Sequence, residues 1–132
     1  MEKKAKILIV DDDADFVEST RIVLESKPYD VIVAVDGNDG LRKAKEEKPD
    51  LVLLDVIMPV KDGFTAAEQF KEDAELSKIP VLMLTSFSTK GGETGLARSR
   101  GYGLEAEDYI DKPVSPEELL KRVDKQLKKI GF

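Results

Sequence analysis

The stretch Leu51-Val-Leu-Leu-Asp-Val-Ile-Met-Pro59 decides the fold, because it places an apolar run between two prolines, Pro49 and Pro59. A run this short is typical of a strand buried on both faces, as in the middle of a parallel sheet, whereas a helix needs more residues. Asp55 ends the run. We therefore expect this carboxylate at the carboxyl edge of the sheet, where open α/β folds bind their ligands.

Four further stretches predict strands, at residues 6–10, 31–35, 81–84 and 108–110. They alternate with stretches whose apolar residues recur every three or four positions, a spacing that predicts helices. This alternation predicts an α/β fold, a doubly wound five-stranded parallel sheet in the flavodoxin-like order 2-1-3-4-5, with helices on both faces. Residues 1–132 are expected to form one domain, with no effector domain in this chain.

Local signals place the ends of these helices. Asp13 is the expected N-cap of the first helix, and Asp36-Gly37 opens the second. At the last helix, Ser115 and Glu118 form a capping box, and Pro116 takes the first helical position. The buried faces are expected to carry Phe16, Thr20, Val23 and Leu24 in the first helix, and Leu120, Val123, Leu127 and Ile130 in the last. The glycine-rich stretch 88–103 is expected to be irregular.

The composition excludes several kinds of site. The 132 residues include no cysteine and no histidine, which excludes disulfides, thiolate zinc sites and histidine-based catalytic triads. The net charge of −6 disfavours direct binding of nucleic acid. No apolar run reaches membrane-spanning length, and the charged N-terminus is unlike a signal peptide, so a cytoplasmic location without membrane contact is expected.

Polar residues gather where the predicted strands end: Asp11 and Asp12 after the first strand, Asp55 at the third, Thr85 at the fourth and Lys112 just past the fifth. In the flavodoxin-like order the first and third strands are neighbours, so the three carboxylates are expected to converge. Like charges in one pocket repel each other, which favours a bound cation. Since all the available ligands are oxygens, Mg²⁺ is the expected ion.

These residue types indicate phosphoryl chemistry. A carboxylate beside Mg²⁺ can attack a phosphoryl group and form an acyl phosphate. Asp55 is the best candidate nucleophile because it stands alone on the central strand, and Lys112 and Thr85 are suited to contact phosphoryl oxygens. No side chain is placed to activate an alcohol, so we expect phosphoryl acceptance followed by hydrolysis.

Four motifs occur in order along the chain: Ile7-Leu-Ile-Val-Asp-Asp12, Leu53-Leu-Asp-Val-Ile-Met-Pro59 with Asp62-Gly63, Leu84-Thr-Ser86 and Tyr109-Ile-Asp-Lys-Pro113. Together they resemble the two-component response regulator receiver domain, of the single-domain kind that chemotaxis regulators represent. The resemblance covers essentially the whole chain. It implies that Asp55 is the phosphoacceptor, that Asp11 and Asp12 hold Mg²⁺, and that the backbone carbonyl of Ile57 is a further ligand beside Asp55.

The same resemblance implies that Thr85 and Lys112 bind the phosphoryl group and that Thr85 and Tyr109 form the switch. The implied donor is a histidine kinase or a histidine phosphotransfer protein, and the implied output is a changed surface that a downstream protein reads. The chain would be a signalling domain rather than an enzyme, a monomer or a phosphorylation-dependent dimer. One departure is the segment between Thr85 and Lys112, which is longer and richer in glycine than the family pattern.

Three other interpretations stay open. Asp11-x-Asp13 superficially fits a haloacid-dehalogenase-type phosphatase, although this leaves Asp55 without a role. The series Asp11, Asp13 and Asp15 suggests a calcium loop, but Phe16 and Ile22 stand where such a loop needs glycine and glutamate. The third is a receiver-like domain that binds partners without phosphorylation.

Overall fold

The computed structural model describes residues 4–55, 63–85, 108–111 and 114–132. Within them the chain forms one parallel sheet in the order β2-β1-β3-β4-β5. The strands are β1 (Ala5–Val10), β2 (Tyr29–Ala34), β3 (Leu51–Asp55), β4 (Val81–Thr85) and β5 (Asp108–Asp111). The helices are α1 (Ala14–Glu25), α2 (Gly37–Glu47), α3 (Gly63–Glu72), the 3-10 helix η1 (Leu76–Lys78) and α5 (Pro116–Lys129).

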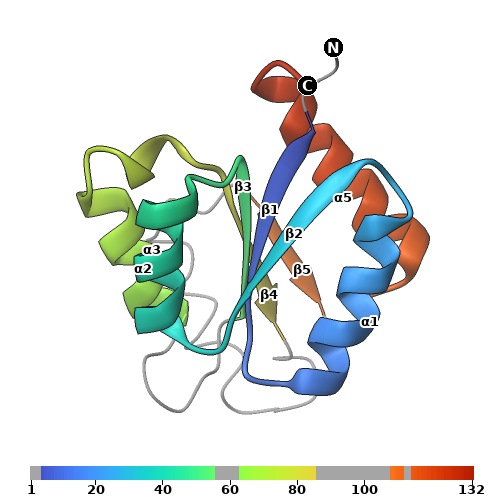
Figure 1. Cartoon of the computed structure of the whole chain (residues 1–132), viewed down its shortest axis with the longest axis horizontal. Coiled ribbons are helices and arrows are strands. Elements are labelled where there is room, and N and C mark those ends of the chain that lie inside the picture. Colours follow the sequence, from blue (N-terminus) through green and yellow to red (C-terminus); the bar gives the residue numbers. More distant parts are fainter. Residues whose placement is uncertain (1–3, 56–62, 86–107, 112–113) are drawn as a thin grey trace.

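Helices cover both faces of this sheet, with α1 and α5 on one face and α2 and α3 on the other (Figure 1). The predicted doubly wound parallel sheet and the flavodoxin-like arrangement of β2, β1, β3 and β4 are confirmed. At the edge, β5 pairs with β4 from Leu82 opposite Asp108 to Thr85 opposite Asp111. The glycine-rich stretch 88–103 lies outside the described residues. No helix in the described part of the chain is long and apolar enough to cross a membrane.

The central strands bury both faces, which explains their uninterrupted apolar runs. On β1, Leu8 and Val10 point into the core under α2 and α3, while Ile7 and Ile9 point into the core under α1 and α5. The residues of β3 alternate in the same way between the two cores. On the face covered by α2 and α3, α2 lies close to β1. A Cβ added to Gly40 of α2 would stand only 2.8 Å from Cγ2 of Val10 in β1.

Polar caps begin the helices as predicted. The Asp13 carboxylate accepts hydrogen bonds at the start of α1, the Asp36 carboxylate accepts one from the Asp39 amide in α2, and the Ser115 hydroxyl accepts one from the Glu118 amide in α5. Each bond satisfies an amide that has no partner within its own helix. The caps therefore fix where the helices start relative to the strand ends before them.

The predicted buried faces need correction. In α1 the buried residues are Val17, Thr20 and Leu24, while Phe16 and Val23 are only half-buried. In α5 they are Leu119, Val123, Gln126 and Leu127. Leu120 is half-buried, and Ile130 is 44% exposed because it follows the last helical residue. Strand β2 also starts and ends earlier than predicted, which leaves Val35 outside it and exposed.

A side chain extends the pairing of β1 and β3 beyond the first residue of β3. The Asp50 amide donates to the carbonyl of Lys6 at 2.7 Å, and the Lys6 amide donates to Oδ2 of Asp50 at 2.8 Å. The first pair of the regular ladder, Ile7 opposite Leu51, follows directly. The Asp50 carboxylate thus replaces a backbone carbonyl in the ladder at the end where both strands begin.

Candidate functional site

The register of β1 and β3 brings two acidic residues to the same edge of the sheet. Val10 pairs with Leu54, and Asp11 and Asp55 are the next residues along the two neighbouring strands. Both strands run in the same direction, so their carboxyl ends lie together. The Asp11 amide also donates to the carbonyl of Ala34 at 3.1 Å, which ties the residue to the end of β2.

Asp11, Asp12 and Asp55 form the predicted acidic cluster. One carboxylate oxygen from each residue lies within 4.8 Å of the other two. Asp11 is 1% exposed and Asp55 is 5% exposed, whereas Asp12 is exposed to solvent. The cluster therefore has two buried carboxylates and one that faces solvent.

This donor set fits a hard divalent cation. Two oxygens that both bind Mg²⁺ at 2.0–2.1 Å are at most about 4.2 Å apart, which is close to the 4.8 Å limit on the oxygen separations in this cluster. All three donors are oxygens, which suits Mg²⁺ rather than a metal that prefers nitrogen or sulfur. Grouping three carboxylates without a cation also costs energy through their mutual repulsion.

The neighbouring acidic residues do not join the cluster. The Asp13 carboxylate accepts hydrogen bonds from the amides of Asp15 and Phe16, so it caps α1. Residues from Ala14 onward are helical, which is incompatible with a calcium loop that runs through twelve residues from Asp11. The carboxylate of Asp11 is grouped with that of Asp55 and not with that of Asp13, which also disfavours the dehalogenase-type arrangement.

The other predicted site residues are placed only in part. Thr85 is the last residue of β4, directly after Leu84, which pairs with Asp55. Tyr109 lies in β5, but the side chains of Thr85 and Tyr109 are outside the described part of the structure. Ile57 and Lys112 also lie outside the described residues. The roles predicted for these four residues stay predictions.

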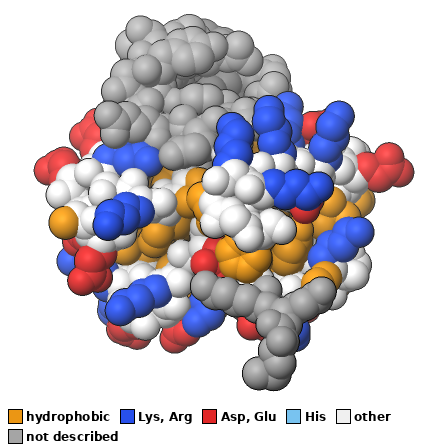
Figure 2. Space-filling view, turned by 90° about the horizontal axis from the view of Figure 1, so that it is seen from above, with side chains coloured by type: hydrophobic (Ala, Val, Ile, Leu, Met, Phe, Trp, Pro, Cys, Tyr) orange, Lys and Arg blue, Asp and Glu red, His pale blue; other side chains and the backbone are white. Residues whose placement is uncertain are grey.

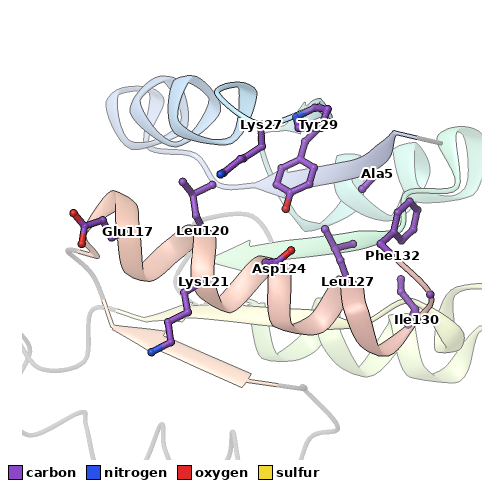
Figure 3. Close-up of a pocket in the computed structure, with 12 residues that line it drawn as sticks. Ala5, Lys27, Tyr29, Glu117, Leu120, Lys121, Asp124, Leu127, Ile130 and Phe132 are labelled. Atoms are coloured by element: carbon purple, nitrogen blue, oxygen red, sulfur yellow. The ribbon is translucent and has the colours of Figure 1, made fainter. Parts of the chain in front are cut away.

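A groove lies at the opposite end of the sheet from the carboxylates. It runs between α5 and the connection from α1 to β2, and its lining includes Ala5 at the start of β1, Tyr29 at the start of β2, and Leu120 and Asp124 of α5 (Figure 3). Seen from the top of Figure 1, the molecule shows apolar side chains between charged ones (Figure 2). The groove lies where β1 and β2 begin, whereas the acidic cluster lies where β1 and β3 end, so the two sites are at opposite edges of the sheet.

Sequence comparison assigns the chain to a family. The profile of the response regulator receiver domain matches residues 7–124. The chain belongs to this family. The match spans β1 through most of α5, and so includes all three carboxylates of the cluster.

Individual proteins are similar to the chain over about nine tenths of its length. The chain is 42% identical over 120 residues to Protein PilH of Pseudomonas aeruginosa, covering 91% of this chain and 95% of PilH. It is 41% identical over 118 residues to the alkaline phosphatase synthesis transcriptional regulatory protein PhoP of Bacillus subtilis, where it covers 89% of this chain and 46% of PhoP. The chain thus spans about half the length of that longer regulator.

Solved receiver structures share the fold. A response regulator from Chloroflexus aurantiacus has a TM-score of 0.85 at 33% identity, covering 96% of this chain and 99% of its own. The receiver domain of the sensor histidine kinase PA1611 from Pseudomonas aeruginosa has a TM-score of 0.84 at 25% identity, with coverage of 96% and 99%. In that structure a magnesium ion is coordinated in the active site cleft.

One contact at the site was missed from the sequence. The backbone amide of Asp13 donates to Oδ1 of Asp11 at 2.9 Å. The sequence predicted the capping role of Asp13 but not this contact. The available signal was an aspartate placed two residues before a helix cap, since aspartate side chains commonly accept from the amide two residues on.

Proposed function

We propose that this receiver domain, residues 1–132, accepts a phosphoryl group on Asp55 and transmits the change to a partner protein. The donor would be a phosphohistidine of a histidine kinase or a histidine phosphotransfer protein, and the reaction would depend on Mg²⁺. The convergence of the Asp11, Asp12 and Asp55 carboxylates at one sheet edge carries the proposal. Membership of the receiver family and the magnesium ion in the PA1611 receiver domain support it.

The three carboxylates would divide the work according to their position. Asp11 and Asp12 would hold Mg²⁺, together with Asp55 itself and the backbone carbonyl of Ile57. When bound, the cation supplies positive charge that offsets the negative charge of the incoming phosphoryl oxygens. Asp55 suits the role of nucleophile because it is the last residue of a central strand and its neighbours hold its backbone in place.

In the proposed transfer, a carboxylate oxygen of Asp55 forms a bond to phosphorus. The bond between phosphorus and the donor histidine nitrogen breaks, and its electron pair stays on that nitrogen. The product is an acyl phosphate on Asp55. A carboxylate nucleophile attacks without losing a proton, so the step requires no base on this chain.

Three residues would connect the new phosphoryl group to the rest of the domain. Lys112 would pair with one phosphoryl oxygen and the Thr85 hydroxyl would donate to another. Movement of Thr85 toward the phosphoryl group would be accompanied by rotation of Tyr109, which would change the surface that a downstream protein reads. In this role the domain is a signalling module rather than an enzyme that turns over a small substrate.

Intact-mass spectrometry after treatment with phosphoramidate tests the proposal. This small donor carries a phosphorus–nitrogen bond, like phosphohistidine. We expect the mass of one phosphoryl group to be gained with Mg²⁺, to be absent with a chelator, and to be released by hydroxylamine, as an acyl phosphate requires.

Asp55→Asn should abolish this mass gain. Asp30→Asn is the matched control, because Asp30 is an exposed aspartate on β2 outside the cluster. Modification that persists in Asp55→Asn, or that is equally strong without Mg²⁺, would overturn the proposal.

A further inference from the structure

We propose that Asp13 is a positioning residue for the carboxylate cluster, because it links the orientation of Asp11 to the start of α1. The Mg²⁺-binding role of Asp11 is taken from the proposed function. The role of Asp13 goes beyond it, since this residue would not touch the cation or the phosphoryl group.

Hydrogen bonds attach Asp13 on both sides. Its amide donates to Oδ1 of Asp11 at 2.9 Å. Its own Oδ1 accepts from the amides of Asp15 at 3.1 Å and Phe16 at 3.2 Å, and its carbonyl accepts from the amide of Val17 at 2.9 Å. One bond therefore leads to the cluster, and three lead into the first turn of α1.

The helix at the other end of this link is fixed by the core. Val17, Thr20 and Leu24 are 8%, 4% and 0% exposed, and Val17 and Leu24 pack in the same core as Ile7 and Ile9 of β1. The first turn of α1 is thus held relative to the strand that carries Asp11. With its cap in place, the backbone of Asp13 is held to that turn, and its amide with it.

Holding Asp11 in this way favours cation binding. A carboxylate has about four lone-pair sites, so a hydrogen bond from one amide leaves room for a metal on the same group. A side chain that is already oriented loses less conformational freedom when the ion binds. Without the cap, the loop from Asp11 to Asp13 would gain alternative conformations, and Asp11 would have to be ordered at the moment of binding.

Mg²⁺ titration followed by amide chemical shifts in NMR spectra tests the inference without any phosphorylation. The two central variants are Asp13→Ala and Asp13→Asn. Both remove the same charge, but asparagine keeps a side-chain oxygen that can cap a helix. The difference in Kd between them therefore measures the effect of the cap, separated from the effect of charge.

We expect Asp13→Ala to raise the Kd for Mg²⁺ by roughly tenfold, the scale on which residues that orient metal ligands act, and Asp13→Asn to recover most of that loss. Asp73→Ala is the matched control. The Asp73 carboxylate accepts in the same pattern, from the amides two and three residues on, Glu75 at 2.9 Å and Leu76 at 3.1 Å, but at the end of the sheet where β4 begins. This control should destabilise the fold and leave the Kd unchanged.

Equal Kd values for Asp13→Ala and Asp13→Asn would overturn the inference, and so would an equal rise in Asp73→Ala. If Asp13→Ala does not fold, Asp13→Gly replaces it, since glycine removes the capping oxygen at little cost to a helix start. The two proposals can fail separately. If the Kd values are as expected but phosphoramidate does not modify Asp55, the role of Asp13 is upheld and only the proposed function is overturned.

Discussion

Replacing Asp12 by asparagine removes one charge from the acidic cluster while keeping the shape of the side chain. The Asp12 carboxylate lies within 4.8 Å of carboxylate oxygens of both Asp11 and Asp55. Two unit charges at that separation repel by about 0.9 kcal/mol even at the dielectric constant of water, so the two pairs together give about 1.7 kcal/mol. Part of the repulsion between the adjacent residues Asp11 and Asp12 persists in the unfolded chain. We therefore expect Asp12→Asn to raise the free energy of unfolding by about 1 kcal/mol without Mg²⁺.

Adding Mg²⁺ should remove most of this difference in stability, because the wild-type domain gains more from the bound ion than Asp12→Asn does. A bound ion stabilises the folded state by about 1.4 kcal/mol when its concentration is ten times Kd. Asp12→Asn removes one ligand, which raises Kd and reduces this gain.

Urea unfolding followed by far-UV circular dichroism measures both effects, with and without Mg²⁺ at matched ionic strength. Asp30→Asn should change little in either condition, because the ion pair that the Asp30 carboxylate makes with Lys4 at 3.8 Å lies on the surface. A loss of stability in Asp12→Asn without Mg²⁺, or an undiminished gain with Mg²⁺, would refute the reasoning.

Three further substitutions test local features. Lys48 ends α2 with a left-handed φ of 50°; Lys48→Gly should stabilise the fold by about 0.5–1 kcal/mol, read from the urea midpoint, and a lower midpoint would contradict this. Gly40→Ala should destabilise by about 1–2 kcal/mol despite the better helix propensity of alanine, because its Cβ meets the fully buried Val10. The double variant with Val10→Ala should show a smaller effect of Gly40→Ala, and strict additivity would exclude the clash. The amides of Leu76 and Glu75, and then Lys45, hold the pKa of Asp73 below its ordinary value. A lowered pKa gives stability that is present above the ordinary pKa and is lost as the pH falls through the folded one, so Asp73→Asn should flatten the fall in Tm below about pH 4.

The central strands were predictable because a strand buried on both faces has an uninterrupted run of apolar residues. β3 and β4 are continuous apolar runs, and their bounds agree with prediction within one residue. The edge strand β2 was predicted less well. Its first residues, Tyr29 and Asp30, pair with Ala5 and Lys6 but are half-buried and exposed, so they carry no apolar signal.

Helix faces were harder to predict than helix starts. The caps at Asp13, Asp36 and Ser115 depend on bonds within three residues, which the local sequence specifies. Which side of α5 is buried depends on packing against the rest of the fold. The apolar residues there allow two overlapping faces, and the core takes Leu119 rather than Leu120.

The acidic cluster followed from strand order, because neighbouring parallel strands must end at the same edge. The contact from the Asp13 amide to Asp11 did not, since it depends on the backbone path between a strand and a helix. The two-residue spacing of Asp11 and Asp13 allows the contact but does not by itself define that path.

The ladder that Asp50 extends at the start of β1 and β3 has a consequence at the other end of the sheet. A slip of one residue between two strands exchanges their faces and shifts every partner. Such a slip would place Asp11 beside Leu54 or Val56 instead of beside Asp55. Asp50 fixes the alignment of β3 with β1 at Lys6, and this alignment sets which residues meet at the acidic cluster. Asp50 and the cluster lie at opposite ends of β3. A residue with no part in the chemistry thus sets which carboxylates meet.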